Sequence, residues 1–99
     1  MNSKQRSFLK GIAMTTEPIF QIGKSALTPE LTTAVGEALE KRELVKISVL
    51  QNCLDDPNDM AARLADRTQS EVVQVIGKKI VLYRQAKEEK HRKIVLPRG

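Results

Sequence analysis

The stretch from residue 21 to residue 29, which reads QIGKSALTP, combines the residue types that bind phosphate groups. Gly23 can take a positive φ and lets another backbone approach closely. Thr28 suits the N-cap of a helix and Pro29 suits its first position. Backbone amides, the positive end of a helix dipole and Lys24 would then lie together, an arrangement that favours a phosphate. On local sequence alone, a plain strand-to-helix connection with a solvated lysine is the commoner explanation.

The tripeptide Gly23-Lys24-Ser25 also matches the end of the phosphate-binding loop of nucleotide hydrolases. That motif requires a glycine five positions before Gly23, and Pro18 occupies this position. The intervening chain is strand-like, and the domain is small for a nucleotide-hydrolysis fold. We therefore reject a nucleotide-hydrolysis interpretation.

Nucleophilic and metal chemistry have little support elsewhere in the chain. Cys53 is the single cysteine, so neither an intrachain disulfide nor a cysteine metal cluster can form, and nearby aspartates disfavour its thiolate. His91 is the single histidine and lies among charged residues, so we interpret it as solvated rather than as a base or ligand. The aspartates of residues 55–59 fit helix capping better than a calcium loop, which needs a loop glycine and a terminal glutamate. We predict no enzyme activity, no cofactor and no metal site.

The charge balance indicates a polyanionic partner. Seventeen Lys and Arg residues against twelve Asp and Glu residues give a net charge of +5. This balance suits nucleic acid or an acidic protein surface without choosing between them. Residues 84–99 contain six of the basic and two of the acidic residues, so the rest of the chain is nearly balanced. A basic patch on the body must therefore come from the way the fold separates its charges.

The length and the apolar content set further bounds. Ninety-nine residues suit one domain with a modest core, and an apolar fraction of 40% is sufficient for it. No apolar run approaches the roughly 20 residues of a membrane span, and no signal-peptide core precedes the first helix. We expect a cytoplasmic protein that does not contact membranes.

Hydrophobic spacing predicts the elements of the first half of the chain. Residues 3–14 form a helix with Ser3 as its cap, and residues 19–22 form a short buried strand. A helical stripe predicts the helix over residues 29–42, where Gly36 suggests close packing against a sheet. The stripe consists of Leu31, Ala34, Val35, Ala38 and Leu39.

Hydrophobic spacing also predicts the elements of the second half, which ends in a charged segment. Residues 44–50 read as a half-buried strand, and Asp56 and Pro57 open a third helix. Two β-branched runs, 72–76 and 80–83, are joined at Gly77-Lys78 by a two-residue turn of type II′. From residue 86 the chain is polar and charged, which predicts an exposed helix extension or a mobile tail. We divide the chain into a body, residues 1–85, and a basic tail, residues 86–99. Removal of the tail should leave a folded body. Whether residues 94–97 dock on the body is left open.

The resulting order is α-β-α-β-α-β-β. Two strand-helix-strand crossovers predict right-handed, locally parallel pairing, and the final hairpin adds an antiparallel pair. The predicted fold is α/β, a single small domain with a four-stranded mixed sheet and three helices.

Four separated blocks of the sequence resemble the YhbY family, the stand-alone bacterial form of the CRM (chloroplast RNA splicing and ribosome maturation) domain. The blocks are SKQRSFLKGIA at 3–13, PIFQIGK at 18–24, EALEKRELVK at 37–46 and VQVIGKKIVLYR at 73–84. Their order and spacing match over residues 3–84. The resemblance implies a fold similar to the C-terminal domain of translation initiation factor 3. It also implies RNA binding and association with precursors of the large ribosomal subunit.

The resemblance further implies a KH-like Gly-x-x-Gly loop, which in KH domains clamps the nucleic-acid backbone. In this chain the loop reads Gly23-Lys24-Ser25-Ala26, with Ala26 where the family usually has the second glycine. A positive φ is unfavourable for alanine. We therefore expect a slightly different loop conformation or a looser contact with RNA.

We predict a monomeric, non-catalytic RNA-binding factor of ribosome assembly. Gly23, Lys24, Ser25 and Ala26 would contact the RNA backbone. The tail of residues 86–99 and further basic residues of the body would add sequence-independent attraction, namely Lys4, Arg6, Lys10, Lys46, Lys79 and Arg84. Because the chain has three aromatic residues, recognition would rest on shape and phosphates rather than on base stacking. The alternative is a protein-interaction adaptor that docks on an acidic partner, which should show an exposed apolar patch.

Overall fold

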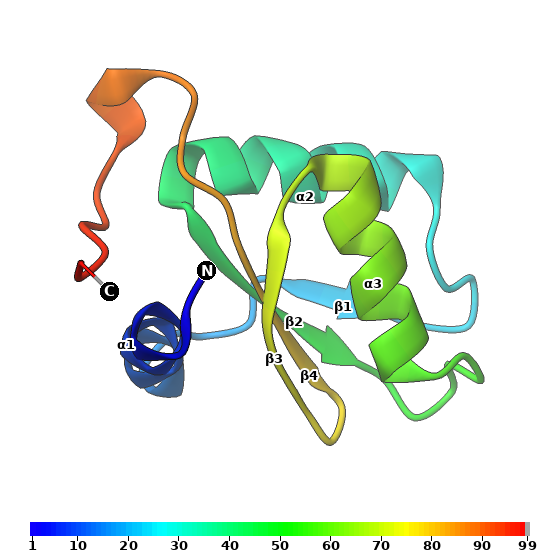
Figure 1. Ribbon diagram of the computed structural model, residues 1–99. Coiled ribbons are helices and arrows are strands. Elements are labelled where there is room, and N and C mark those ends of the chain that lie inside the picture. Colours follow the sequence, from blue (N-terminus) through cyan, green and yellow to red (C-terminus); the bar gives the residue numbers. More distant parts are fainter. Residues whose placement is uncertain (99) are drawn as a thin grey trace.

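Three helices surround a four-stranded sheet in the computed structural model, which describes residues 1–98 (Figure 1). The α-β-α-β-α-β-β order and the predicted fold class are confirmed. The helices are α1 (Ser3–Met14), α2 (Pro29–Arg42) and α3 (Pro57–Thr68), with a single 3-10 turn, η1 (Glu89–His91), near the end. The strands are β1 (Phe20–Ile22), β2 (Leu44–Val49), β3 (Glu71–Ile76) and β4 (Lys79–Tyr83).

The order of the strands in the sheet is β1-β2-β4-β3. β1 pairs in parallel with β2, as the first crossover predicts, whereas β4 pairs antiparallel with both β2 and β3. The parallel pairing predicted for the second crossover is wrong, because β4 folds back from β3 and takes the place next to β2. The turn between β3 and β4 has the two predicted residues, with Gly77 at φ 54 and Lys78 outside the left-handed region, as a type II′ hairpin requires.

The sheet is covered on both faces. One face packs against α2 and α3, which lie next to each other, through a core of aliphatic side chains that includes Leu39, Ile47 and Leu64. The other face packs against α1 in a smaller cluster that contains Leu9, Ala13, Leu44, Val73, Val81 and Tyr83. Since successive side chains of a strand point to opposite faces, the alternation of β2 supplies both clusters.

Local signals account for most helix boundaries. Thr28 and Asp56 cap α2 and α3 as predicted, each accepting a hydrogen bond from a backbone N–H inside its helix. The cap of α1 is Asn2 rather than Ser3, and Asn2 forms a reciprocal capping box with Gln5. Gly36 lies near Thr68 of α3 and not against the sheet, so the reason predicted for it is wrong.

Most side chains of the chain end are exposed, as the sequence predicts, but the segment also docks on the body of the fold. Ala86 is buried, and Ile94 and Leu96 pack against the cluster beneath α1. The carboxylate of Glu43 accepts hydrogen bonds from the backbone N–H groups of Ala86, Lys93 and Ile94. In Figure 1 this segment descends from the end of α2 toward α1. Within residues 1–98, none of the helices is both long enough and apolar enough to cross a membrane.

Candidate nucleic-acid interface

The loop of residues 23–26 forms a tight turn at the end of β1. The backbone N–H of Ala26 donates to the carbonyl of Gly23 at 3.0 Å, and Lys24 and Ser25 between them are exposed. Ala26 has φ 53 and therefore lies in the left-handed region, which glycine adopts more easily than alanine. Gly23 lies outside that region, so the loop does not use the positive φ that glycine allows at this position. Whether the loop differs from the family's loop, or contacts RNA more loosely, stays a prediction.

The left-handed conformation at Ala26 is held by its surroundings. An L-residue in this region is disfavoured by about 1–2 kcal/mol relative to right-handed conformations. Ala26 and Leu27 pack against the core beneath α2, and the turn hydrogen bond to Gly23 closes the loop. The loop therefore holds an alanine at a positive φ that local preference alone would disfavour.

The start of α2 is a weaker anion site than its sequence predicts. The N–H of Leu31 is occupied by Oγ1 of Thr28 at 3.1 Å, and Pro29 has no N–H to offer. Glu30 places a carboxylate in the first turn, where it would repel a bound phosphate. The exposed amide groups and the lysine of the loop, rather than the helix dipole, are the groups available to an anion.

The end of β2 lies between this loop and the β3–β4 hairpin. The N–H of Leu50 donates to the carbonyl of Ile22 at 2.8 Å, and the N–H of Val49 donates to the carbonyl of Lys78 at 2.7 Å. Because neighbouring strands are about 4.8 Å apart, Gly23 and Lys78 lie roughly two strand spacings from each other. Lys78 was not among the predicted site residues. A lysine in a two-residue hairpin turn is the sequence signal that would have indicated it.

Three of the predicted lysines surround one groove between α1 and the sheet. Lys10 comes from α1, Lys46 from β2 and Lys79 from β4. The groove has a volume of about 520 Å³, and within the described chain no acidic residue lines it. The other residues that line it are Ser7, Gly11, Ala13, Met14, Gln74, Ile76 and Val81. The fold thus gathers lysines on a surface without carboxylates, which the composition alone could not show.

Further observations place the ammonium group of Lys46 and add Lys4 to the same side of the sheet. Lys46 donates from Nζ to the carbonyl of Ala13 at 3.1 Å, which holds its ammonium group at the C-terminal end of α1. Lys4 is exposed and precedes Ser7 by three residues, so it lies on the helical stripe that lines the groove. Both positions keep positive charge on the α1 side of the sheet.

Two predicted arginines are used inside the fold. The guanidinium of Arg6 donates to the carbonyls of Val72 and Val73, at the β-bulge of the edge strand β3. The guanidinium of Arg84 donates to the carbonyls of Thr68 and Gly36 at 2.7 and 3.0 Å. We therefore remove both residues from the candidate interface.

A family model described as the CRS1 / YhbY (CRM) domain matches residues 1–84. The chain belongs to the CRM domain family. The four sequence blocks lie within the matched range, and so do the loop of residues 23–26 and all three lysines of the groove.

Relatives of this CRM protein have names that mention RNA. One from Bacillus subtilis (strain 168), "Probable RNA-binding protein YqeI", is 47% identical over 90 residues, or 91% of this chain and 94% of the relative. An "RNA-binding protein" from Haemophilus influenzae is 33% identical over 98 residues, or 99% of this chain and 96% of the relative. The solution structure of the hypothetical protein SAV1595 from Staphylococcus aureus, described as a candidate RNA-binding protein, has a TM-score of 0.78 and 43% identity. That likeness covers 98% of this chain and 99% of the other, so it includes the chain end beyond the CRM match.

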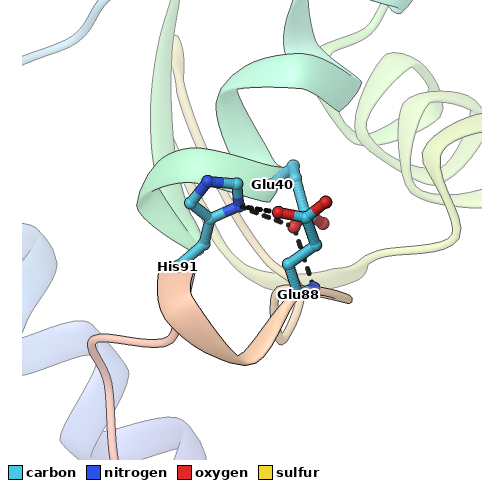
Figure 2. A group of neighbouring side chains, drawn as sticks. All are labelled: Glu40, Glu88 and His91. Atoms are coloured by element: carbon cyan, nitrogen blue, oxygen red, sulfur yellow. Dashed lines mark hydrogen bonds and ion pairs between the residues drawn. The ribbon is translucent and has the colours of Figure 1, made fainter.

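The chain end of this CRM protein places His91 beside two glutamates. Figure 2 shows the imidazole of His91 facing the carboxylate of Glu40, with Glu88 next to them. Nδ1 of His91 lies 3.0 Å from Oε2 of Glu40 and 3.6 Å from Oε2 of Glu88. His91 is 29% exposed at its side chain and is bonded, so the prediction of a solvated histidine is wrong.

These three side chains could in principle hold a cation, since their ligand atoms lie within 4.8 Å of one another. The carboxylate of Glu40 already accepts the backbone N–H groups of Lys87 and Glu88, at 2.8 and 3.1 Å, besides its bond with His91. The guanidinium of Arg84 lies 3.7 Å from the same carboxylate. These hydrogen bonds explain the cluster, because they attach the chain end to Glu40 of α2.

Cys53 follows β2 and faces the core. Its side chain is buried, and its Sγ lies 3.7 Å from Sδ of Met60 in α3. This position fits a packing role.

Proposed function

We propose that this protein binds RNA through its phosphate backbone, using the loop of residues 23–26 and the lysines around the groove. The observation that carries the proposal is the gathering of Lys10, Lys46 and Lys79 from three separate elements around one surface without carboxylates. Such a surface attracts polyanions independently of sequence. The exposed hairpin residue Lys78 extends it toward the loop.

The comparisons support RNA rather than an acidic protein as the polyanion. The chain belongs to the CRM family, and the relatives from B. subtilis and H. influenzae have RNA binding in their names. An adaptor would be expected to show a broad exposed apolar patch. Two of the most exposed large apolar side chains, Met14 and Ile76, lie instead among the lysines of the groove.

We further propose that the RNA is ribosomal, in precursors of the large subunit, and that the protein binds it as a monomer. The resemblance to the YhbY family supports this assignment. Fractionation of a cell lysate on a sucrose gradient, followed by detection of the protein, tests it. Co-sedimentation with large-subunit precursors is expected, and a protein confined to the top fractions would contradict the ribosomal assignment.

Charge reversal tests the RNA-binding surface itself. Lys24→Glu and Lys79→Glu each place a carboxylate where we expect a phosphate. Each should weaken the binding of RNA at low salt and reduce the slope of log K against log salt by roughly 0.7–0.9 for each phosphate that the variant no longer neutralises. Both lysines are exposed, and such substitutions usually change stability by less than about 0.5 kcal/mol.

Lys87→Glu is the matched control because it makes the same change of charge at the other end of the molecule. Lys87 lies beside Glu40 in the last turns of α2, whereas the loop precedes the first turn. We expect the control to retain the salt slope of the parent protein. Equal RNA affinity for the parent, Lys24→Glu and Lys79→Glu across a salt titration would refute the proposed surface and favour the adaptor.

A further inference from the structure

The groove beneath α1 has the dimensions of a ligand site. Its volume of about 520 Å³ lies within the range of about 300–1,000 Å³ that is usual for sites of small molecules. On the helix side, Ser7, Gly11 and Met14 line it, spaced by four and three residues on one face of α1. On the sheet side, the bulge in β3 turns Gln74 toward the groove immediately after Val73, which is buried beneath α1.

The groove combines an apolar floor with a cationic rim. Met14 and Ile76 are 83% and 60% exposed, although apolar side chains of this size are usually buried. Val81 also lines the groove and belongs to the buried cluster under α1. A ligand that fits must therefore offer an apolar surface and a negative charge close to each other. A nucleotide has both, in its base and its phosphate.

The groove is continuous with the loop of residues 23–26 along the sheet. Directly paired residues form a row from Ile76 through Lys79 and Ser48 to Gln21, two positions before Gly23. Paired residues of neighbouring strands share a face, and this face is the one that α1 leaves partly open. A strand of RNA held at the loop can therefore pass over β2 and reach the groove.

We propose that the groove receives an unpaired base of a single-stranded RNA segment, while Lys10 and Lys79 bind the phosphates on either side of it. This inference rests on the proposed RNA binding and names the form of RNA that this surface takes. A base inside a duplex is stacked and paired, so only an unpaired nucleotide can present its flat face to the groove. The sulfur of Met14 makes favourable contacts with aromatic rings, so it can take part of the role for which RNA-binding proteins usually use aromatic side chains.

Gly11 permits a test that leaves the charges of the site unchanged. It lines the groove, and no atom lies within 4 Å of the place where its Cβ would be. Gly11→Leu fills the mouth of the groove, and leucine favours a helix more than glycine does, so α1 should remain folded. The matched control is Ala62→Leu, at an exposed position of α3 on the other side of the sheet.

Fluorescence anisotropy with two labelled probes distinguishes the outcomes: a single strand of ten uridines and an RNA duplex of ten base pairs. We expect Gly11→Leu to weaken binding of the single strand about tenfold, the order of magnitude that one stacked base contributes. Its duplex affinity should change by less than about twofold, since the attraction of the lysines for the phosphates remains. Met14→Gln, at an exposed position, removes the apolar contact without filling the groove. It should also weaken binding of the single strand more than binding of the duplex.

Equal weakening of both probes, or no change with either probe, would overturn the assignment of the groove while leaving the proposed function in place. Failure of the parent protein to bind either RNA would instead refute the proposed function. A 4-thiouridine in the single strand gives an independent check. Its crosslink should map to Met14 or Ile76, and crosslinks confined to residues 23–26 would overturn the groove site.

Discussion

The backbone N–H of Ile94 donates a hydrogen bond of 2.8 Å to Oε1 of Glu43, fifty-one residues earlier in the chain. Glu43 is fully buried at the junction of α2 and β2, where its φ of 66 ends the helix. The same carboxylate accepts the N–H groups of Ala86 and Lys93, and its backbone carbonyl accepts the N–H of Arg84. One buried acid therefore holds the chain end in place, and burial is tolerated because three amides satisfy the charge.

Truncation after Gln85 should destabilise the protein, contrary to the expectation from its sequence. The truncated chain leaves the carboxylate of Glu43 without three donors and uncovers the cluster that Ile94 and Leu96 cover. Since each hydrogen bond to a charged group contributes about 1.5–3 kcal/mol, we expect a loss of at least about 3 kcal/mol in the free energy of unfolding. Urea denaturation measures it, with removal of residues 98–99 as the control. An unchanged denaturation midpoint for the long truncation would show that the chain end does not stabilise the fold.

His91→Ala should raise the pKa of Glu40. The hydrogen bond with His91, followed by those from the backbone N–H groups of Lys87 and Glu88, lowers the pKa of Glu40 to about 2. Without the imidazole, the two backbone donors remain, so the pKa should rise but stay below the ordinary value of 4.5. A titration of the Glu40 side-chain carbon by NMR measures this change. A pKa that stays near 2 in the variant would show that the backbone donors alone set it.

Acid should weaken the attachment of the chain end. Burial raises the pKa of Glu43, but the N–H donors of Ala86, Ile94 and Lys93 outweigh it and hold the pKa below 4.5. Like Glu40, Glu43 binds its proton more weakly in the folded state than in the unfolded state. Its contribution to stability is therefore complete above about pH 4.5 and is lost as the pH falls toward its folded-state pKa. Unfolding free energies measured between pH 6 and pH 2 should fall across this range, and a profile without slope would contradict the role of both glutamates.

Ala26→Gly should preserve the fold and the binding of RNA. Glycine removes the strain of φ 53, worth about 1–2 kcal/mol, while its greater freedom in the unfolded chain offsets up to about 1 kcal/mol. The midpoint of thermal unfolding should therefore hold or rise slightly. RNA affinity should also hold or rise, because the second glycine lets the RNA backbone approach more closely. A weaker affinity in a stable variant would show that the methyl group of Ala26 itself contacts RNA.

Cys53→Ser should leave RNA affinity unchanged. The side chain is buried beside Met60 and lies in the core cluster under α2 and α3. A hydroxyl group placed there without a partner costs about 1–3 kcal/mol, so a lower melting temperature is expected. Comparison with Cys53→Ala separates the cost of polarity from the loss of volume. Loss of RNA binding by a folded variant would contradict a packing role.

The sequence by itself determined the elements whose signals are local. The helix over residues 29–42 was predicted with its observed bounds because the apolar stripe, the Thr28 cap and Pro29 agree within one segment. The turn at Gly77-Lys78 was likewise set by one glycine with a positive φ. The alternation of β2 also placed Lys46 and Ser48 on one face before the partner of that face was known.

The tertiary structure decided everything that depends on distant partners. Local preference disfavours a positive φ at Ala26, yet packing against the core and the turn to Gly23 impose it. Charge alone could not show that Arg6 is bound to carbonyls of β3 while Lys79 remains exposed beside the groove. The polar composition after residue 85 indicates solvent exposure, but the buried carboxylate that binds this segment lies about half the chain away, at Glu43. Contacts between residues so far apart in the sequence produce no periodic pattern, because they form only when the folded sheet brings the two segments together.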